Sequence, residues 1–194
     1  MGSRTGTAAA RARQEKHMTT AEYLETPETL QPREQNYGEL HVADAPTVTH
    51  QRLVGRLFKA LDEHVGLYKL GEVLLSPIDV ILDGPKALVV QPDLVFVSAA
   101  RAIIFEDRIW GAPDLAVEVL SPWPRVGRTE ERVALFAKYG VQECWLVHQV
   151  TKRVEVVRFD GGSEVARTAH GWHEPIVSHV LPAFRVSIGS IGGW

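Results

Sequence analysis

The sequence predicts an α/β (α+β) fold in which helices flank a mixed central sheet and additional β-hairpins extend it. Short β-rich runs are divided by proline and glycine, and a helical pattern at 129–139 lies between two such runs, at 115–120 and 143–148. A helix between two strands either crosses over or packs on the sheet that they form. The 194 residues are 45% hydrophobic and 23% charged, which provides enough apolar material for one globular core.

The first residues show no apolar pattern that could pack. Residues 1–17, MGSRTGTAAARARQEKH, combine small residues with scattered charges and lack the apolar centre, about 7 to 15 residues long, of a signal peptide. We expect a disordered or tag-like tail there, followed by a single domain over residues 18–194. From Thr19 the pattern TTAEYLETPETL predicts a helix of at most two turns, with threonine as its cap and Pro27 as its stop.

The most strongly helical stretch begins at Pro46-Thr47, and Gly66 is expected to end it. Its apolar residues form one stripe at helical spacing: Leu53, Val54, Leu57, Phe58, Leu61 and Val65. Residues 38–42 are expected to form a strand before this helix. After it, the runs GEVLL, IDVIL, ALVV and LVFV predict consecutive strands.

The second half of the chain continues with strands around one helix. Residues 115–120, LAVEVL, are almost continuously apolar, which predicts a strand covered on both faces at the middle of the sheet. The following helix is expected to end at Gly140. CWLVH and RVEVVRF predict two strands around a QVTK hairpin, and the tail over 164–188 is expected to be weaker β-structure.

Charge and motif content exclude several classes of protein. Acidic residues exceed basic ones by 24 to 21, a formal charge of -3, so no global basic field attracts nucleic acid and any contact with a polyanion must be local. The single cysteine, Cys144, cannot form an internal disulfide, and no apolar run could span a bilayer. We therefore expect a cytoplasmic protein with no membrane segment. No serine-hydrolase elbow or glycine-rich nucleotide loop occurs.

Glu118 conflicts most strongly with its surroundings, because it is the one charged residue in LAVEVL. Burying an unpaired carboxylate is costly, so this side chain must be neutral, paired or bound to a cation. One alternative is an edge strand on which Glu118 faces solvent. The other is a metal ligand or a catalytic acid.

Two aspartates begin neighbouring apolar strands, Asp93 in PDLVFV and Asp114 in PDLAVEVL. Pro-Asp is common turn chemistry, so each alone has a structural explanation. Asp114 lies about 13 Å along the strand from Glu118, too far to share an ion, whereas Asp93 on an adjacent strand, about 4.8 Å away, can meet it. Two such carboxylates suit Mg²⁺ or Mn²⁺, which polarises a phosphodiester and lowers the pKa of an attacking water.

Several motifs, taken in order, resemble those of one known family. QPDLVFV, GAPDLAVEVLSP, a helix and YGVQECWLV resemble the Uma-two family of restriction-endonuclease-like proteins in the PD-(D/E)XK nuclease superfamily, from about Glu34 to Leu181. The resemblance implies a restriction-endonuclease-like core with catalytic residues at Asp93 and Glu118. It also implies an accessory acid at Glu34, in EQNYG, and an accessory histidine–glutamine pair at His50-Gln51.

The sequence departs from the family pattern at the expected lysine. Leu120 occupies the superfamily's usual lysine position, two residues after the glutamate, and Arg132 occupies the position on the following helix from which this family is expected to supply it. By the same resemblance, the family has an aspartate at the position of Arg128 and a tyrosine at the position of Phe136. Arginine keeps a positive charge but does not readily give up a proton, which predicts attenuated catalysis.

Arg128 and Arg132 have two other interpretations. They lie four residues apart on one helix, so they could grip a phosphate as a basic pair. They could instead belong to a solvated helix surface, paired with Glu130 and Glu131. Lys86 is a weaker replacement for the missing lysine. His170, His173 and His179 are the only hint of a zinc site, and no second cluster supports them.

The leading hypothesis is a metal-dependent endonuclease that hydrolyses phosphodiester bonds of nucleic acid, with DNA expected in preference to RNA. Asp93 and Glu118 would hold Mg²⁺ or Mn²⁺, and Arg132 would be the electrostatic partner. The alternative is a degenerate nuclease fold that binds nucleic acid or a protein partner, which the arginines at 128 and 132 favour. The oligomeric state is open, with a homodimer among the alternatives.

Overall fold

The computed structural model describes residues 17–27, 32–121 and 126–191. Residues 1–16 of the expected tail lie outside this part of the chain. Within the described residues, no helix combines the length and apolar character needed to cross a bilayer.

The main sheet has six strands in the order β11-β10-β9-β8-β6-β3. These strands are β3 (Gly71–Leu75), β6 (Leu94–Ser98), β8 (Leu115–Leu120), β9 (Glu143–His148), β10 (Arg153–Asp160) and β11 (Ser163–Gly171). β8 and β9 run parallel, and the other neighbouring pairs run antiparallel. The predicted mixed sheet is therefore confirmed, and LAVEVL forms β8 at an interior position.

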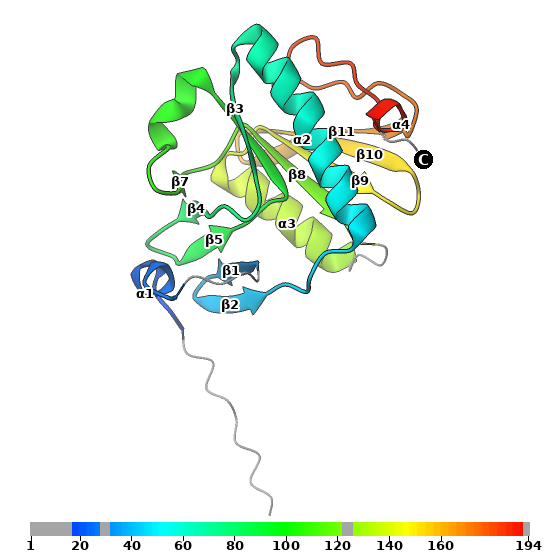
Figure 1. Cartoon of the computed structure of the whole chain (residues 1–194). Helices are drawn as coiled ribbons and strands as arrows, with labels where there is room; N and C mark the ends of the chain where they lie inside the picture. Colours follow the sequence, from blue (N-terminus) through cyan, green and yellow to red (C-terminus); the bar gives the residue numbers. More distant parts are fainter. Residues whose placement is uncertain (1–16, 28–31, 122–125, 192–194) are drawn as a thin grey trace, which may run out of the picture.

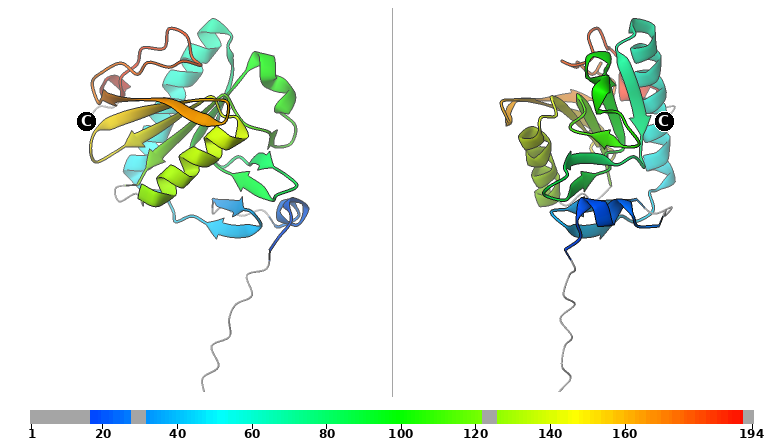
Figure 2. Two further views of the ribbon diagram at one scale, coloured as in Figure 1. Left: turned by 180° about the vertical axis from the view of Figure 1, so that it is seen from behind. Right: turned by 90° about the vertical axis from the view of Figure 1, so that its left-hand side faces the viewer.

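Two helices cover opposite faces of this sheet, α2 (Val48–Tyr68) on one and α3 (Val126–Tyr139) on the other (Figure 1; Figure 2, right). α3 is the crossover between the parallel strands β8 and β9, as the order of patterns predicts. It ends at Gly140, whose φ of 93° is the left-handed conformation that glycine adopts most easily.

Alternation along β8 decides which face each side chain joins. Val117 packs in the same apolar cluster as Leu57 of α2, whereas Ala116 packs with Phe136 of α3. Because alternate residues of a strand point the same way, Glu118 belongs to the α3 face together with Ala116.

A second sheet, in the order β2-β1-β5-β4-β7, joins the N-terminal hairpin to the middle of the chain. Its strands are β1 (Arg33–Asn36), β2 (Glu39–Val42), β4 (Val80–Asp83), β5 (Leu88–Val90) and β7 (Ile109–Trp110). The predicted additional hairpins thus form a sheet of their own. β1 was not predicted, because all four of its residues, REQN, are polar and show no apolar alternation.

Among the residues that the structure describes there are three further, short helices: α1 (Thr20–Leu24), the 3₁₀ helix η1 (Ala99–Ile104) and α4 (Ile188–Ile191). α1 begins where the sequence predicts. The Thr19 side chain accepts from the Glu22 N–H, and the Glu22 carboxylate accepts from the Thr19 N–H at 2.8 Å, which satisfies two free donors of the first turn.

Two predictions about boundaries are wrong. α2 continues through Gly66 to Tyr68, and the next residue, Lys69, takes the left-handed conformation itself, at φ 52°. Hydrogen bonds from the Lys69 N–H to the Gly66 carbonyl and from the Leu70 N–H to the Val65 carbonyl close the last turn, so the cap lies after Gly66. The tail over 164–188 is β-structure only to Gly171, because its later apolar residues, among them Trp172 and Phe184, pack irregularly against the α2 side of the core.

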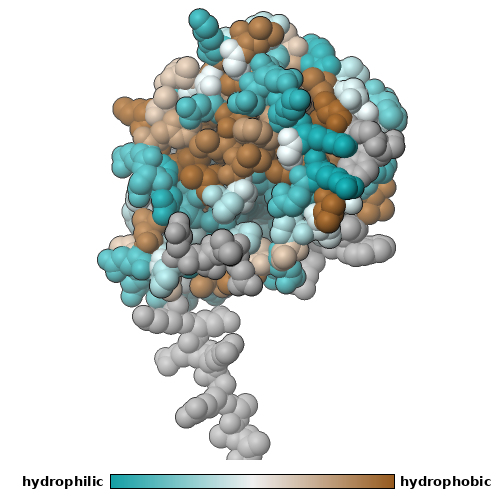
Figure 3. All heavy atoms as spheres, in the orientation of Figure 1, coloured by the Kyte–Doolittle hydropathy of each residue, from teal (hydrophilic) through white to brown (hydrophobic). Residues whose placement is uncertain are grey.

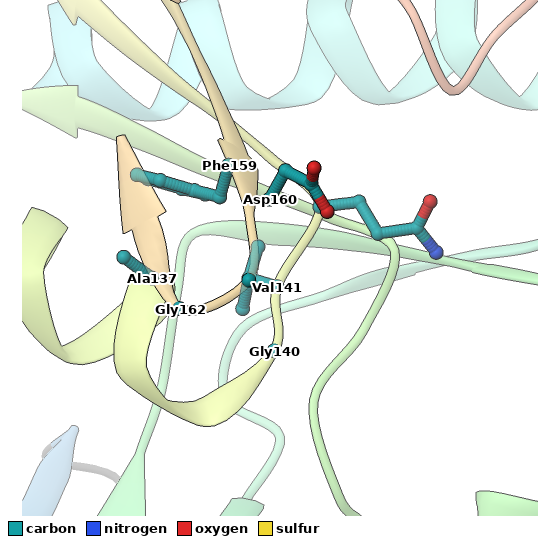
Figure 4. Close-up of a pocket in the computed structure, with 8 residues that line it drawn as sticks. Ala137, Gly140, Val141, Phe159, Asp160 and Gly162 are labelled. Atoms are coloured by element: carbon teal, nitrogen blue, oxygen red, sulfur yellow. The ribbon is translucent and has the colours of Figure 1, made fainter. Parts of the chain in front are cut away.

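Two surface features lie away from the candidate acids Glu34, Asp93 and Glu118. In Figure 3, apolar side chains gather between α2 and η1, over the outer strand β3, where Leu75 is 39% exposed. A shallow pocket lies where α3 ends beside the β10–β11 turn (Figure 4). It is lined by Ala137, Gly140, Val141, Gln142, Phe159, Asp160, Gly161 and Gly162. None of the candidate site residues contributes to this pocket.

Candidate active site

Asp93 and Glu118 come together because β6 and β8 are neighbours. The antiparallel register pairs Leu94 with Val117, so Asp93, one residue earlier, stands beside Glu118, one residue later. Leu94 packs on the α2 side and Val95 on the α3 side, which places Asp93 on the α3 side with Glu118. Directly opposite residues have Cβ atoms about 4.5 to 5.5 Å apart, so the two carboxyl groups can converge on one point.

These carboxylates are half-buried. The side chains of Asp93 and Glu118 are 20% and 18% exposed. β8 lies inside the sheet, between β9 and β6, which rules out the edge-strand explanation for Glu118. The Glu118 side chain is nevertheless not fully buried. The site is therefore shielded yet open to a small ion or a phosphate.

Two groups hold Asp93 in place. Its Oδ2 accepts a hydrogen bond of 2.7 Å from the Val119 N–H, and His50 Nε2 lies 3.3 Å from the same oxygen. His50 comes from the first turn of α2, where Thr47 caps the helix by accepting from the His50 N–H. The accessory histidine implied by the family resemblance thus reaches the carboxylate from the opposite layer of the fold.

The Asp93 carboxylate changes the protonation of His50. Burial alone lowers the pKa of the imidazole, but Asp93, the Val119 backbone and Glu118 outweigh it, and the net pKa is raised. Stability from this contact is present at low pH and is lost as the pH rises through the raised pKa.

Arg132 of α3 joins two carboxylates from different sheets. Its Nε donates to Glu118 Oε1 at 2.8 Å, and its two terminal nitrogens donate to Glu34 Oε1 and Oε2 at 2.7 and 2.9 Å. The Arg132 side chain is 18% exposed. The planar guanidinium suits this arrangement, since it can meet one carboxylate with a fork and another with its remaining N–H.

The solvated-surface interpretation of Arg132 is therefore wrong. Glu130, its expected partner, instead accepts hydrogen bonds from Arg167 of β11, and Glu131 is exposed. Arg128 is exposed in the first turn of α3, and Gln51 is exposed in the first turn of α2. No hydrogen bond ties either side chain to the acids within the described residues.

Gln91 is a residue of the site that sequence reasoning missed. Its N–H donates to Glu34 Oε1 at 2.5 Å, its Oε1 accepts from the Arg33 N–H, and its Nε2 donates to Asp79. These bonds fix β1, and with it Glu34, beside the segment that leads to Asp93. The only signal was its position in QPDLVFV, directly before Pro92-Asp93.

Crowding of negative charge sets the electrostatics of the site. Burial, with the charges of Asp93 and Glu34, raises the pKa of the Glu118 carboxyl to about 7, although Arg132 acts to lower it. Burial opposes the charge on Arg132, but the two glutamates outweigh it and its pKa is raised. Three carboxylates thus share one permanent positive charge, which leaves the site able to take up a cation.

The donors fit a divalent ion that keeps most of its waters. Within the described residues, no group of three or more His, Cys, Asp or Glu side chains is arranged to hold a metal. Mg²⁺ commonly uses one or two carboxylates with water and substrate oxygens, which two opposed acids can supply. His170, His173 and His179, all in the described part of the chain, likewise form no metal site.

Two further residues considered from the sequence, Asp114 and Lys86, have structural partners away from the site. Asp114 is buried at the opposite end of β8, where it accepts from the Ser98 N–H, Arg101 and Gln142. Lys86 pairs with Asp83 at 2.7 Å in the β4–β5 turn, so it does not replace the missing lysine. Asp114 therefore takes the structural role that its Pro-Asp context allows.

A family model described as "Putative restriction endonuclease", Uma2, matches residues 20–189, which include every candidate site residue. The chain belongs to the Uma2 family. The resemblance seen in the sequence motifs is thereby confirmed. No curated protein matches this Uma2 chain.

A solved structure shares the fold. The crystal structure of a "putative nuclease belonging to DUF820" from Anabaena variabilis superposes with a TM-score of 0.74 at 19% identity, covering 90% of this chain and 97% of that one. At this identity the similarity establishes the fold, and the predicted restriction-endonuclease-like architecture agrees with it.

We expect Glu118→Gln to remove a pH-dependent destabilisation of this Uma2 protein. The folded pKa of about 7 lies above the ordinary value of 4.5, so the folded state retains a proton that the unfolded state loses, and stability falls as the pH rises between these values. In chelator, the stability of the variant relative to wild type should rise by about 3 kcal/mol between pH 4.5 and pH 8.

Urea unfolding at several pH values measures this difference. Glu63→Gln is the control, because Glu63 is exposed on α2 and its side chain contacts Lys59 rather than another acid. A difference for Glu118→Gln that is flat with pH would show that its carboxylate is fully compensated in the fold.

Arg132→Gln should lower the free energy of unfolding by about 2 kcal/mol, because it leaves two half-buried carboxylates without their shared cation. Arg128→Gln, one turn earlier and exposed, should change it by less than about 0.5 kcal/mol. Thermal and urea unfolding at neutral pH compare the two. Equal effects would mean that the bonds from Arg132 to Glu34 and Glu118 contribute no net stability.

Proposed function

We propose that this protein is a divalent-metal-dependent endonuclease that hydrolyses phosphodiester bonds of nucleic acid, with DNA preferred over RNA. The observation that carries the proposal is the position of Asp93 beside Glu118 of β8, directly before β6 and on the same face of the sheet. Membership of the Uma2 family supports it.

Each residue of the site has a distinct role in this proposal. Asp93 and Glu118 would hold Mg²⁺ or Mn²⁺, which when bound supplies polarisation of the phosphodiester and a lowered pKa for the attacking water. His50 and the Val119 N–H orient Asp93. Arg132 orients Glu118 and keeps Glu34 close, so that the acids are held in place before substrate arrives.

Arg132 also limits the chemistry of the site. A guanidinium that stays protonated cannot accept a proton from water, and its donors here already point at two carboxylates. It can stabilise charge that develops on a phosphate only if one of these contacts loosens. We therefore infer slow cleavage rather than rapid turnover.

The second candidate function is a degenerate nuclease fold that binds nucleic acid or a protein without cleaving it. The same three contacts favour it, since Arg132 supplies Glu118 with a counter-charge from within the chain. The two functions differ in whether the acids have a catalytic consequence, and cleavage assays separate them.

Cleavage of labelled DNA and RNA, single- and double-stranded, tests the proposal. We expect cleavage of DNA with Mg²⁺ or Mn²⁺, none with chelator, and a loss of at least about 100-fold in Glu118→Ala. Glu63→Ala is the matched control on an exposed helix position and should retain full activity. Cleavage that survives in Glu118→Ala would point to a contaminating nuclease, and absence of all cleavage would favour the binding function.

Arg132→Lys should raise the cleavage rate several-fold if the arginine attenuates catalysis. The ammonium is compact, cannot span Glu118 and Glu34 as the fork does, and can donate to the attacking water or the scissile phosphate. Single-turnover cleavage at one salt concentration, with Glu118→Ala as background, measures the effect. A fall in rate would show that the arginine itself is the better catalytic cation.

A further inference from the structure

Two tyrosines and two lysines gather on the surface at the far end of α3 from its first turn. They are Tyr37, Lys86, Lys138 and Tyr139, here called the tyrosine–lysine cluster. Tyr37 comes from the β1–β2 turn, Lys86 from the β4–β5 turn and the other two from the end of α3. Figure 2 (left) looks onto the side of the sheet that α3 covers.

Hydrogen bonds and ring contacts hold the cluster together. The hydroxyl oxygens of Tyr37 and Tyr139 lie 3.3 Å apart, and Lys138 Nζ donates to the Tyr37 hydroxyl at 3.4 Å. Lys138 Nζ is 5.3 Å and Lys86 Nζ is 5.8 Å from the centre of the Tyr139 ring. Two ammonium groups and two hydroxyls thus lie around one aromatic ring.

The backbone positions these side chains in advance. The Gly38 N–H donates to the Ala87 carbonyl at 3.1 Å, which fastens the turn carrying Tyr37 to the turn carrying Lys86. Tyr37 itself is in the left-handed conformation, at φ 50°. A surface fixed in this way loses little conformational freedom when it binds a ligand.

The cluster carries a positive excess. The Lys86 ammonium donates to Asp83 Oδ2 at 2.7 Å. Among the described residues, Asp83 has the one carboxylate that pairs with a lysine of the cluster, so two positive charges face one negative charge. Tyr37 is 38% exposed and Lys86 60% exposed, so a ligand can reach both.

The same two elements form the cluster and the acidic site. β1 and its turn supply Glu34 and Tyr37, and α3 supplies Arg132 and Tyr139. Seven residues of α3 separate Arg132 from Tyr139, which is about 10.5 Å at 1.5 Å per residue. This distance spans a few nucleotides of a bound strand, since the phosphates of one duplex strand advance about 3.4 Å each along the helix axis.

We propose that the tyrosine–lysine cluster binds the sugar-phosphate backbone of the nucleic-acid substrate within a few nucleotides of the cleaved bond. The lysines neutralise a phosphate, the tyrosine hydroxyls donate to its oxygens, and the Tyr139 ring provides a face for a sugar or base. This inference rests on the proposed nuclease function and gives the site a second contact on a chain whose net charge is negative.

Binding of a short fluorescein-labelled DNA, single- or double-stranded, in chelator at increasing salt tests the inference. Lys138→Gln should weaken binding about three- to tenfold at fixed salt and reduce the slope of log K against log salt by about 0.9 for duplex. Lys86→Gln with Lys138→Gln should reduce the slope by about 1.8. Lys59→Gln is the matched control, because Lys59 is exposed on α2, across the sheet, and also has a carboxylate partner, Glu63.

The outcomes separate the two proposals. If the wild-type protein binds DNA and the slope of log K against log salt is the same for Lys138→Gln and Lys59→Gln, the proposed role of the cluster is wrong. The nuclease proposal would still stand, because it does not depend on these lysines. A wild-type protein that neither binds nor cleaves nucleic acid at low salt would overturn both. Thermal unfolding of each variant confirms that a loss of binding is not a loss of fold.

Discussion

The contact of Arg132 with Glu118 and Glu34 is the constraint on which the arrangement of the site depends. It ties α3 to β8 of the main sheet through one nitrogen and to β1 of the second sheet through two more. Without a positive charge at this point, the second sheet would present a carboxylate to two others. Where the two sheets meet, a cation therefore lies between their acids and offsets the repulsion.

This constraint also explains why an arginine suits a position at which the family resemblance predicts a lysine. Lysine offers a point charge and would satisfy one carboxylate well, whereas the guanidinium satisfies two in fixed directions. The protein thereby gains a defined geometry in the absence of a metal ion. Under the proposed nuclease function, the same rigidity would restrict the freedom of the cation to follow charge as it moves during the reaction. Structural order and catalytic power would then be opposed at a single residue.

Much of the fold could be predicted from the sequence, because its strongest elements have clear periodicity. The stripe of α2, the continuous apolar run of β8 and the glycine after α3 each correspond to an observed element or boundary. β1 could not be predicted, since polar residues form it and tertiary contacts such as the Gln91–Glu34 bond hold it in place. The predicted helix end at Gly66 was wrong, because a glycine permits a helix to end but does not require it to.

The candidate site was predictable to a similar degree. The pairing of Asp93 with Glu118 followed from two adjacent apolar strands, and strand pairing is a local property of the pattern. The partners of Arg132 did not follow from spacing along the helix, which suggested Glu130 and Glu131 as one alternative. The family resemblance placed Arg132 in one site with Glu34 and Glu118, and its side chain contacts both of these acids.

The Arg132–Glu34 pair joins residues 98 positions apart in the chain. Closing so long a loop costs entropy that only later contacts recover, and folds with distant contacts form slowly. During synthesis β1 leaves the ribosome well before α3 exists. Glu34 therefore has no contact with Arg132 until about two thirds of the chain has been made. The acidic centre therefore cannot form before α3 is made, and a chain truncated before Arg132 carries Glu34 and Glu118 without their shared counter-charge.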